Sequence, residues 1–137
     1  MKGRSTAVIR LLAIDMDETC LNHKRIISDQ TMDALHQAAD AGIIVVPTTG
    51  RALACLPYQL KGQPFYQYVI SSNGAVVTDL KSDKDLFHEN IPASVAAEFL
   101  EQCDTINIGI SAHINHDFIL QGHALRLLGK VSYGKDA

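Results

Sequence analysis

Three short apolar segments alternate with segments of helical spacing, and this order constrains the fold of the chain most. The apolar segments cover residues 8–14, 43–47 and 68–71. Near-continuous apolar runs of this length are typical of buried parallel strands. Because helical patterns over 28–41 and 52–60 separate them, the order predicts right-handed crossovers. The expected fold is α/β, a Rossmann-like, doubly wound parallel sheet.

The two intervening helices have recognisable sequence signals. Ser28 is a suitable N-cap for the first, and Gly42 is placed to end it. Its inward face is expected to carry Met32, Leu35 and Ala39. In the second, Pro57 is expected to kink or end the helix. The inward residues of that second helix are expected to be Leu53, Leu56 and Leu60.

The pattern changes after Asn73-Gly74. Segments 75–78 and 86–91 predict a hairpin, joined by the polar stretch 79–85. Pro92 can open a helix to about Cys103. The expected inward face of that helix comprises Val95, Phe99 and Leu100.

The last part of the chain predicts two paired strands. Residues 106–111 alternate apolar and polar, and 116–121 offer a partner strand. We therefore expect a core portion over residues 1–80. Residues 81–137 are expected to form a linker hairpin and part of a smaller α+β cap domain.

Composition excludes several function classes for these 137 residues. Twelve Lys and Arg against fifteen Asp and Glu leave a net charge of −3, which argues against a nucleic-acid partner. No apolar run approaches the roughly 20 residues that span a bilayer, so no membrane association is expected. Three cysteines, an odd number without metal-type spacing, favour a reduced, cytoplasmic setting.

Polar residues follow all three predicted parallel strands. Asp15 and Asp17 end the first, Thr48-Thr49-Gly50-Arg51 the second, and Ser72-Asn73-Gly74 the third. Carboxyl ends of parallel strands lie at one edge of a sheet, where open α/β folds bind ligands. Residues i and i+2 of an extended chain point the same way, so both aspartates can face that edge.

These residue types suit phosphate chemistry. A hard cation such as Mg²⁺ relieves the repulsion between two neighbouring carboxylates. A carboxylate can also act as a nucleophile, and a second acid can protonate the leaving oxygen and later activate water. Thr49 is suited to hold a phosphoryl oxygen, and Gly50 lets backbone amides approach an anion.

The motifs resemble those of the haloacid dehalogenase (HAD) superfamily. Asp15-Met16-Asp17-Glu18-Thr19 is similar to its D-x-D-x-T signature. Thr48-Thr49-Gly50-Arg51 and Ser72-Asn73-Gly74-Ala75 look like the Cof-type sugar-phosphatase branch. Three motifs in order at three strand ends are far more specific than D-x-D-x-T alone.

The resemblance implies roles for these residues. Asp15 would be the nucleophile and a Mg²⁺ ligand, and Asp17 the general acid/base that also lends its backbone carbonyl to the metal. Thr49 would bind the transferring phosphoryl group. Less directly, the resemblance places Thr19, Gly50, Arg51, Asn73 and Gly74 around the phosphate or substrate pocket. The implied activity is a Mg²⁺-dependent phosphatase acting through an aspartyl-phosphate on a small phosphorylated metabolite, by default a sugar phosphate.

The chain also departs from the family pattern. Glu18 stands where this branch usually has glycine. The family's later lysine and its Gly-Asp acidic motif are not recognisable, and no Gly-Asp pair occurs in the sequence. We therefore expect a chain truncated within the cap, weak or inactive alone, because losing one such charge stabiliser costs on the order of a hundred-fold in rate. Exposed sheet edges in a partial sheet predict self-association.

Other interpretations remain open. The acid pair could be a solvated strand end, Thr49 a helix cap, and Arg51 the partner of a surface acid. Cys20 as a nucleophile, with His23 nearby in the sequence, and a metal site at His113, His116 and His123 are less favoured. A non-catalytic remnant with a binding or assembly role is the main alternative. A phosphoacceptor receiver lacks its aspartate after the third strand, and no G-x-G-x-x-G supports a dinucleotide-binding domain.

Overall fold

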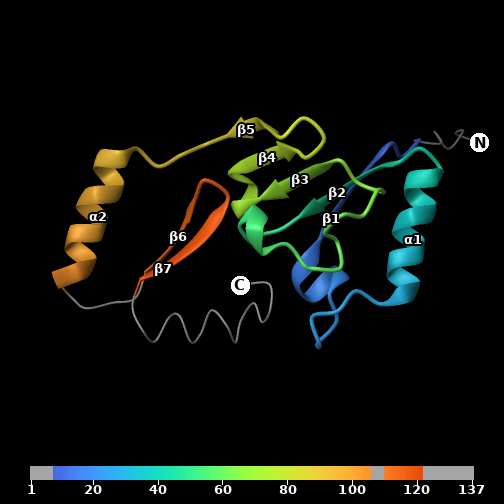
Figure 1. The fold of residues 1–137 in the computed structure, drawn as a ribbon, viewed down its shortest axis with the longest axis horizontal. Coiled ribbons are helices and arrows are strands. Elements are labelled where there is room, and N and C mark those ends of the chain that lie inside the picture. Colours follow the sequence, from blue (N-terminus) through green and yellow to red (C-terminus); the bar gives the residue numbers. More distant parts are fainter. Residues whose placement is uncertain (1–7, 106–109, 122–137) are drawn as a thin grey trace, which may run out of the picture.

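Five strands form one mixed sheet in the computed structural model, which describes residues 8–105 and 110–121. In sheet order the strands are β1 (Leu11–Asp15), β2 (Ile44–Thr48), β3 (Tyr68–Ser71), β4 (Val76–Asp79) and β5 (Lys84–His88). The first three are parallel, and β4 and β5 continue the sheet antiparallel (Figure 1). The predicted Rossmann-like α/β fold is confirmed.

The register of the parallel strands brings their carboxyl ends together. Asp15 is opposite Thr48 on β2, and Thr48 is opposite Ile70 on β3. The segments that follow these three strands therefore begin at one edge of the sheet.

Helix α1 (Asp29–Asp40) has the predicted start and stop signals. The Thr31 backbone N–H donates to Ser28 Oγ at 3.2 Å, which caps the first turn. Gly42 ends the helix with φ +81°, a left-handed conformation that glycine adopts without a Cβ penalty. Leu35 is the fully buried residue of this helix.

The hydrophobic core lies on one face of the parallel strands. Its cluster joins Leu35 of α1 to Val45 of β2, and Leu12 and Ile14 of β1 pack against it. The opposite face of β1 is open, and Leu11 is 54% exposed. The prediction of a buried first strand is therefore wrong, because β1 is covered on one face only, and it also lies at the edge of the described sheet.

The predicted helix over 52–60 is also wrong. The chain forms a 3-10 turn at Leu53–Cys55, followed by further turns. Pro57 lacks an N–H, and Arg51 Nη1 donates to the Cys55 carbonyl at 3.2 Å. Leu56 and Leu60 are nevertheless buried. The apolar pattern therefore predicted correctly that these two side chains are buried, but it predicted the wrong backbone conformation.

The predicted hairpin forms as β4 and β5, and β4 pairs with β3, so both strands extend the core sheet. Helix α2 (Ala93–Thr105) also forms where predicted. Its predicted inward residues Val95, Phe99 and Leu100 are 53%, 57% and 40% exposed, which corrects that expectation. Cys103 is its buried side chain.

A second, two-stranded sheet contains β6 (Ile110–Ile114) and β7 (Asp117–Gln121), and the predicted pairing is confirmed. The predicted strand over 106–111 lies outside the described residues for 106–109. Within the described ranges, no helix has the length and apolar character to cross a membrane.

Candidate active site

The candidate site begins where β1 ends. Residues Met16–Cys20 form a tight turn in which the Leu21 N–H donates to the Met16 carbonyl at 2.8 Å. Met16 and Cys20 are buried, and this anchoring leaves Asp15 and Asp17 exposed at the edge of the sheet. Thr19 Oγ1 donates to Asp15 Oδ2 at 2.8 Å, so the two outer residues of the motif contact each other.

Glu18 lies in the left-handed region of this turn, with φ 60° and ψ 4°. A side chain with a Cβ is strained there, whereas glycine is not. This explains physically why glycine suits this position and what Glu18 costs the chain.

Arg51 holds Asp17 through a bidentate ion pair. Its Nε donates to Oδ2 at 3.0 Å and its Nη2 donates to Oδ1 at 2.7 Å. The Arg51 side chain is 2% exposed and that of Asp17 is 49% exposed. The fork geometry fixes the carboxylate of Asp17 against the buried guanidinium.

Thr49 occupies a buried position directly after β2. Its N–H donates to the Ile70 carbonyl at 2.9 Å, and its Oγ1 accepts the Arg51 N–H at 3.1 Å. The side chain therefore caps a turn, and no helix starts there. Capping uses the oxygen as an acceptor and leaves the hydroxyl proton able to donate to an anion.

The loop after β3 lies against this turn. The Ser72 N–H donates to the Arg51 carbonyl at 2.8 Å, and the Asn73 N–H donates to the Thr49 carbonyl at 3.3 Å. A Cβ added at Gly50 would lie 2.6 Å from Asn73 Oδ1, so the Asn73 side chain approaches this closely only because residue 50 is glycine, and it would have to shift to admit a Cβ. Gly74 continues the loop with φ +90°.

The sequence predicts these residues at one edge of the sheet, and the structure brings five of them into one connected group. Asp17, Thr49, Gly50, Arg51 and Asn73 are linked through the contacts above, and Asp15 is opposite Thr48. The Arg51–Asp17 pair was anticipated only as contact with some surface acid. Two sequence features could have indicated this ion pair. They are the arginine directly after Gly50 and the acid pair in the motif after the first strand.

One of the two predicted carboxylate ligands, Asp15, is placed to bind a Mg²⁺ ion through its side chain. Among residues 8–105 and 110–121 there is no group of three or more His, Cys, Asp or Glu positioned for a metal. Both carboxylate oxygens of Asp17 accept from Arg51, so its side chain is committed elsewhere. Asp15 remains, and Mg²⁺ commonly takes one or two carboxylates with waters and substrate phosphate. The Asp15 carboxylate therefore suits such an ion, with the remaining positions left for non-side-chain oxygens.

The alternative nucleophile and metal interpretations gain no support. Burial, and secondarily the Asp15 charge, raises the pKa of the Cys20 thiol, which disfavours the thiolate. His113 contacts Ser72 Oγ at 2.8 Å, and His116 lies 3.4 Å from Asp85. His123 lies outside the described residues.

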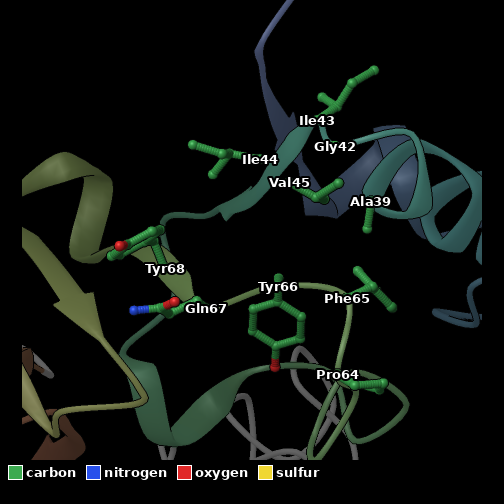
Figure 2. Close-up of a pocket in the computed structure, with 10 residues that line it drawn as sticks. All are labelled: Ala39, Gly42, Ile43, Ile44, Val45, Pro64, Phe65, Tyr66, Gln67 and Tyr68. Atoms are coloured by element: carbon green, nitrogen blue, oxygen red, sulfur yellow. The ribbon is translucent and has the colours of Figure 1, made fainter.

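A surface hollow of about 410 Å³ lies away from this group (Figure 2). Its lining includes Ile44 and Tyr68, the first residues of β2 and β3, together with Ala39 of α1. Strand starts and strand ends lie at opposite edges of parallel strands, so this hollow is not the candidate phosphate site.

The family is established by comparison with known proteins. Residues 12–132 match the family of haloacid dehalogenase-like hydrolases. The chain belongs to this family, as the resemblance of its motifs predicted.

Phosphatases are among the similar curated proteins. The chain is 37% identical over 76 residues to 5-amino-6-(5-phospho-D-ribitylamino)uracil phosphatase YcsE of Bacillus subtilis, covering 56% of this chain and 30% of that protein. It is 36% identical over 86 residues to HMP-PP phosphatase of Yersinia pestis, covering 63% and 31%. The chain thus spans about a third of the length of these relatives.

Solved structures share the fold. A haloacid dehalogenase-like hydrolase from B. subtilis superposes with a TM-score of 0.70 at 29% identity, covering 94% of this chain and 47% of that one. The phosphatase BT1666 from Bacteroides thetaiotaomicron gives 0.75 at 24% identity, covering 96% and 49%. The described fold therefore corresponds to about half of each of those chains.

Proposed function

We propose that this chain carries the nucleophile half of a phosphatase site that hydrolyses a small phosphorylated metabolite. The supporting observation is the connected group at the carboxyl edge of β1, β2 and β3, with Asp15 exposed beside it. Family membership and similarity to named phosphatases support the same reaction class. A sugar phosphate is the substrate class that the motif resemblance favours.

The reaction would proceed in two balanced steps. In the first, an Asp15 oxygen attacks phosphorus, the bond to the leaving oxygen breaks, and Asp17 gives that oxygen a proton. In the second, Asp17 takes a proton from water while the water oxygen attacks phosphorus. Inorganic phosphate leaves and the Asp15 carboxylate is restored.

The other residues would bind and orient the phosphoryl group. The Thr49 hydroxyl can donate to a phosphoryl oxygen while its oxygen still accepts the Arg51 N–H. The Asn73 side chain lies close to Gly50 and offers an amide group at the same edge. A bound Mg²⁺ would supply charge neutralisation between the Asp15 carboxylate and the phosphate.

The Arg51 pair imposes a condition on the acid/base role of Asp17. Both carboxylate oxygens are occupied as acceptors. Asp17 must therefore give up one of these hydrogen bonds and take up a proton on the released oxygen before it can act as the acid of the first step. We infer that the Arg51–Asp17 pair is a resting arrangement, and that substrate binding releases Asp17 from Arg51.

We also propose that the 137-residue chain alone is weak or inactive. Its sequence has no Gly-Asp pair and no recognisable counterpart of the family lysine. The competing proposal is a non-catalytic remnant with a binding or assembly role. The reading frame after Ala137 separates the two, since lysine and Gly-Asp motifs there favour the enzyme and a stop codon favours the remnant.

A phosphatase assay tests the function directly. Phosphate release from p-nitrophenyl phosphate and a panel of sugar phosphates is measured with and without Mg²⁺, for this chain and any longer gene product. We expect slow release that disappears in Asp15→Asn and is unchanged in Asp33→Asn, an exposed acid on α1. Release that survives Asp15→Asn refutes the proposal, and robust release by the short chain refutes its weakness.

We propose three further properties of the chain. The division into a core over 1–80 and a linker hairpin with partial cap over 81–137 follows the motif resemblance. A cytoplasmic location follows the cysteine content. Self-association through the open edge of β1 is favoured by exposed Val8, Ile9 and Leu11 beside it.

A further inference from the structure

The β6–β7 hairpin makes three polar contacts with β5 and with the turns that follow β2 and β3. The Ala54 N–H donates to the His116 carbonyl at 3.0 Å, and His116 Nε2 lies 3.4 Å from Asp85 Oδ2. The third contact joins His113 Nδ1 and Ser72 Oγ at 2.8 Å. Figure 1 shows the hairpin beside the end of the sheet where β3 and β4 meet.

Ser72 belongs to the loop that helps to form the candidate phosphate site. Ser72 and Asn73 have φ values of 52° and 57°, so two consecutive non-glycine residues are left-handed. Such backbone persists when its surroundings hold it in place. The Ser72 N–H bond to Arg51 is one restraint, and the His113 bond to the Ser72 side chain is a second.

The His113 ring is itself held in place. It packs edge-on against Phe118 of the facing strand, with ring centroids 5.5 Å apart and an interplanar angle of 72°. Partial burial lowers the pKa of His113, which favours the uncharged ring with one donor and one acceptor nitrogen. Either tautomer can form the bond to the Ser72 hydroxyl.

We propose that His113 is a positioning residue for the phosphate site, holding Ser72 and thereby the Asn73 side chain over Gly50. The hairpin and the site are then coupled: release of the hairpin loosens the Ser72–Gly74 loop. The coupling to phosphate rests on the proposed function, whereas the restraint of the loop does not.

Amide hydrogen exchange tests the restraint without any activity. In His113→Ala, we expect exchange at residues 72–74 to quicken about 2- to 10-fold, the range for losing one hydrogen bond. His113→Asn should restore slow exchange, because its side-chain amide can reach the Nδ1 position. Ser72→Ala should match His113→Ala, and the double variant should be no faster than either single variant.

The matched control is His88→Ala on β5, an exposed histidine on another strand. Its exchange at residues 72–74 should equal that of the unchanged protein. Additive effects in the double variant, or unchanged exchange in His113→Ala, overturn the proposal.

Inorganic phosphate binding then tests the link to the site. His113→Ala and Ser72→Ala should weaken phosphate binding by the same factor. If loop exchange changes and phosphate affinity does not, the coupling is overturned while the restraint stands. If the unchanged protein binds no phosphate, the proposed function fails, and the exchange experiment still decides the role of His113.

Discussion

The guanidinium of Arg51 clamps the carboxylate of Asp17 in a bidentate pair, with N–O distances of 2.7 and 3.0 Å. Arg51 is almost fully buried, and a third hydrogen bond ties it to the Cys55 carbonyl. One side chain therefore connects the motif after β1 to the turn after β2. This link organises the site and supports the first prediction.

Replacing Arg51 by lysine should destabilise the protein by about 1–3 kcal/mol, because a point charge cannot reproduce the bidentate fork. The free energy of unfolding from urea denaturation measures this. Arg10→Lys, at an exposed arginine, is the control and should change little. Equal stability of Arg51→Lys and the unchanged protein would show that the pair contributes nothing.

Replacing Glu18 by glycine should stabilise the chain by up to about 1 kcal/mol, because it removes the left-handed strain at φ 60°. The larger conformational entropy that glycine loses on folding offsets part of this gain. Thermal and urea midpoints provide the measurement. Glu18→Ala keeps the Cβ and should give no comparable gain. A glycine variant no more stable than the alanine variant contradicts the strain argument.

Replacing Gly50 by alanine should displace the Asn73 side chain, because the new Cβ would lie 2.6 Å from Asn73 Oδ1. Stability and inorganic phosphate binding should both fall. Adding Asn73→Gly removes the obstructing side chain and suits the backbone at φ 57°, so stability should recover.

The contrasting case is Gly42, where an added Cβ meets nothing within 4 Å but φ is +81°. Gly42→Ala should lose stability through its backbone, and Asn73→Gly should not rescue it. Rescue of both alanine variants, or of neither, would contradict the steric explanation.

Replacing Asp79 by asparagine should weaken the β4–β5 turn at neutral pH. The carboxylate accepts from Gln67 Nε2 at 2.8 Å, Lys81 N–H at 2.9 Å and Ser82 Oγ at 2.9 Å. The Gln67 hydrogen bond foremost, then those from Ser82 and Lys81, lowers the pKa of Asp79 from its usual 3.8.

A lowered pKa in the folded state gives stability that is present above pH 3.8 and lost as the pH falls through the folded-state value. The urea midpoints of the unchanged protein and Asp79→Asn should therefore converge in acid. The control Asp83→Asn changes an exposed acid in the same turn and leaves the three Asp79 hydrogen bonds in place. A constant difference at all pH values would contradict the assignment.

Replacing Leu11 by lysine should reduce self-association, because it places charge on the open face of the edge strand β1. Sedimentation velocity across a concentration series measures the oligomeric state. The Leu86→Lys control changes an exposed apolar residue on β5 and should not act through the β1 edge. A monomer at high concentration in the unchanged protein refutes self-association.

Periodicity by itself predicted much of the fold. Strands β2 and β3, helix α1 with Ser28 and Gly42 at its ends, the β4–β5 hairpin and helix α2 all form where the pattern indicated. These elements depend on local signals, namely apolar spacing, a capping hydroxyl and a left-handed stop. The order of the strands also placed Asp15, Thr49 and Asn73 at one edge of the sheet.

Burial and pairing depended on neighbours that are distant in sequence. The apolar run of β1 is the same whether one face or two are covered, and only the sheet order made it an edge strand. Segment 52–60 has helical spacing, yet Arg51 and Pro57 favour turns there. Likewise, the pairs Arg51–Asp17 and His113–Ser72 join residues 34 and 41 positions apart. Sequence alone therefore determined which residues meet at the sheet edge, and tertiary structure decided their partners, because a side chain's partner depends on how separate segments pack.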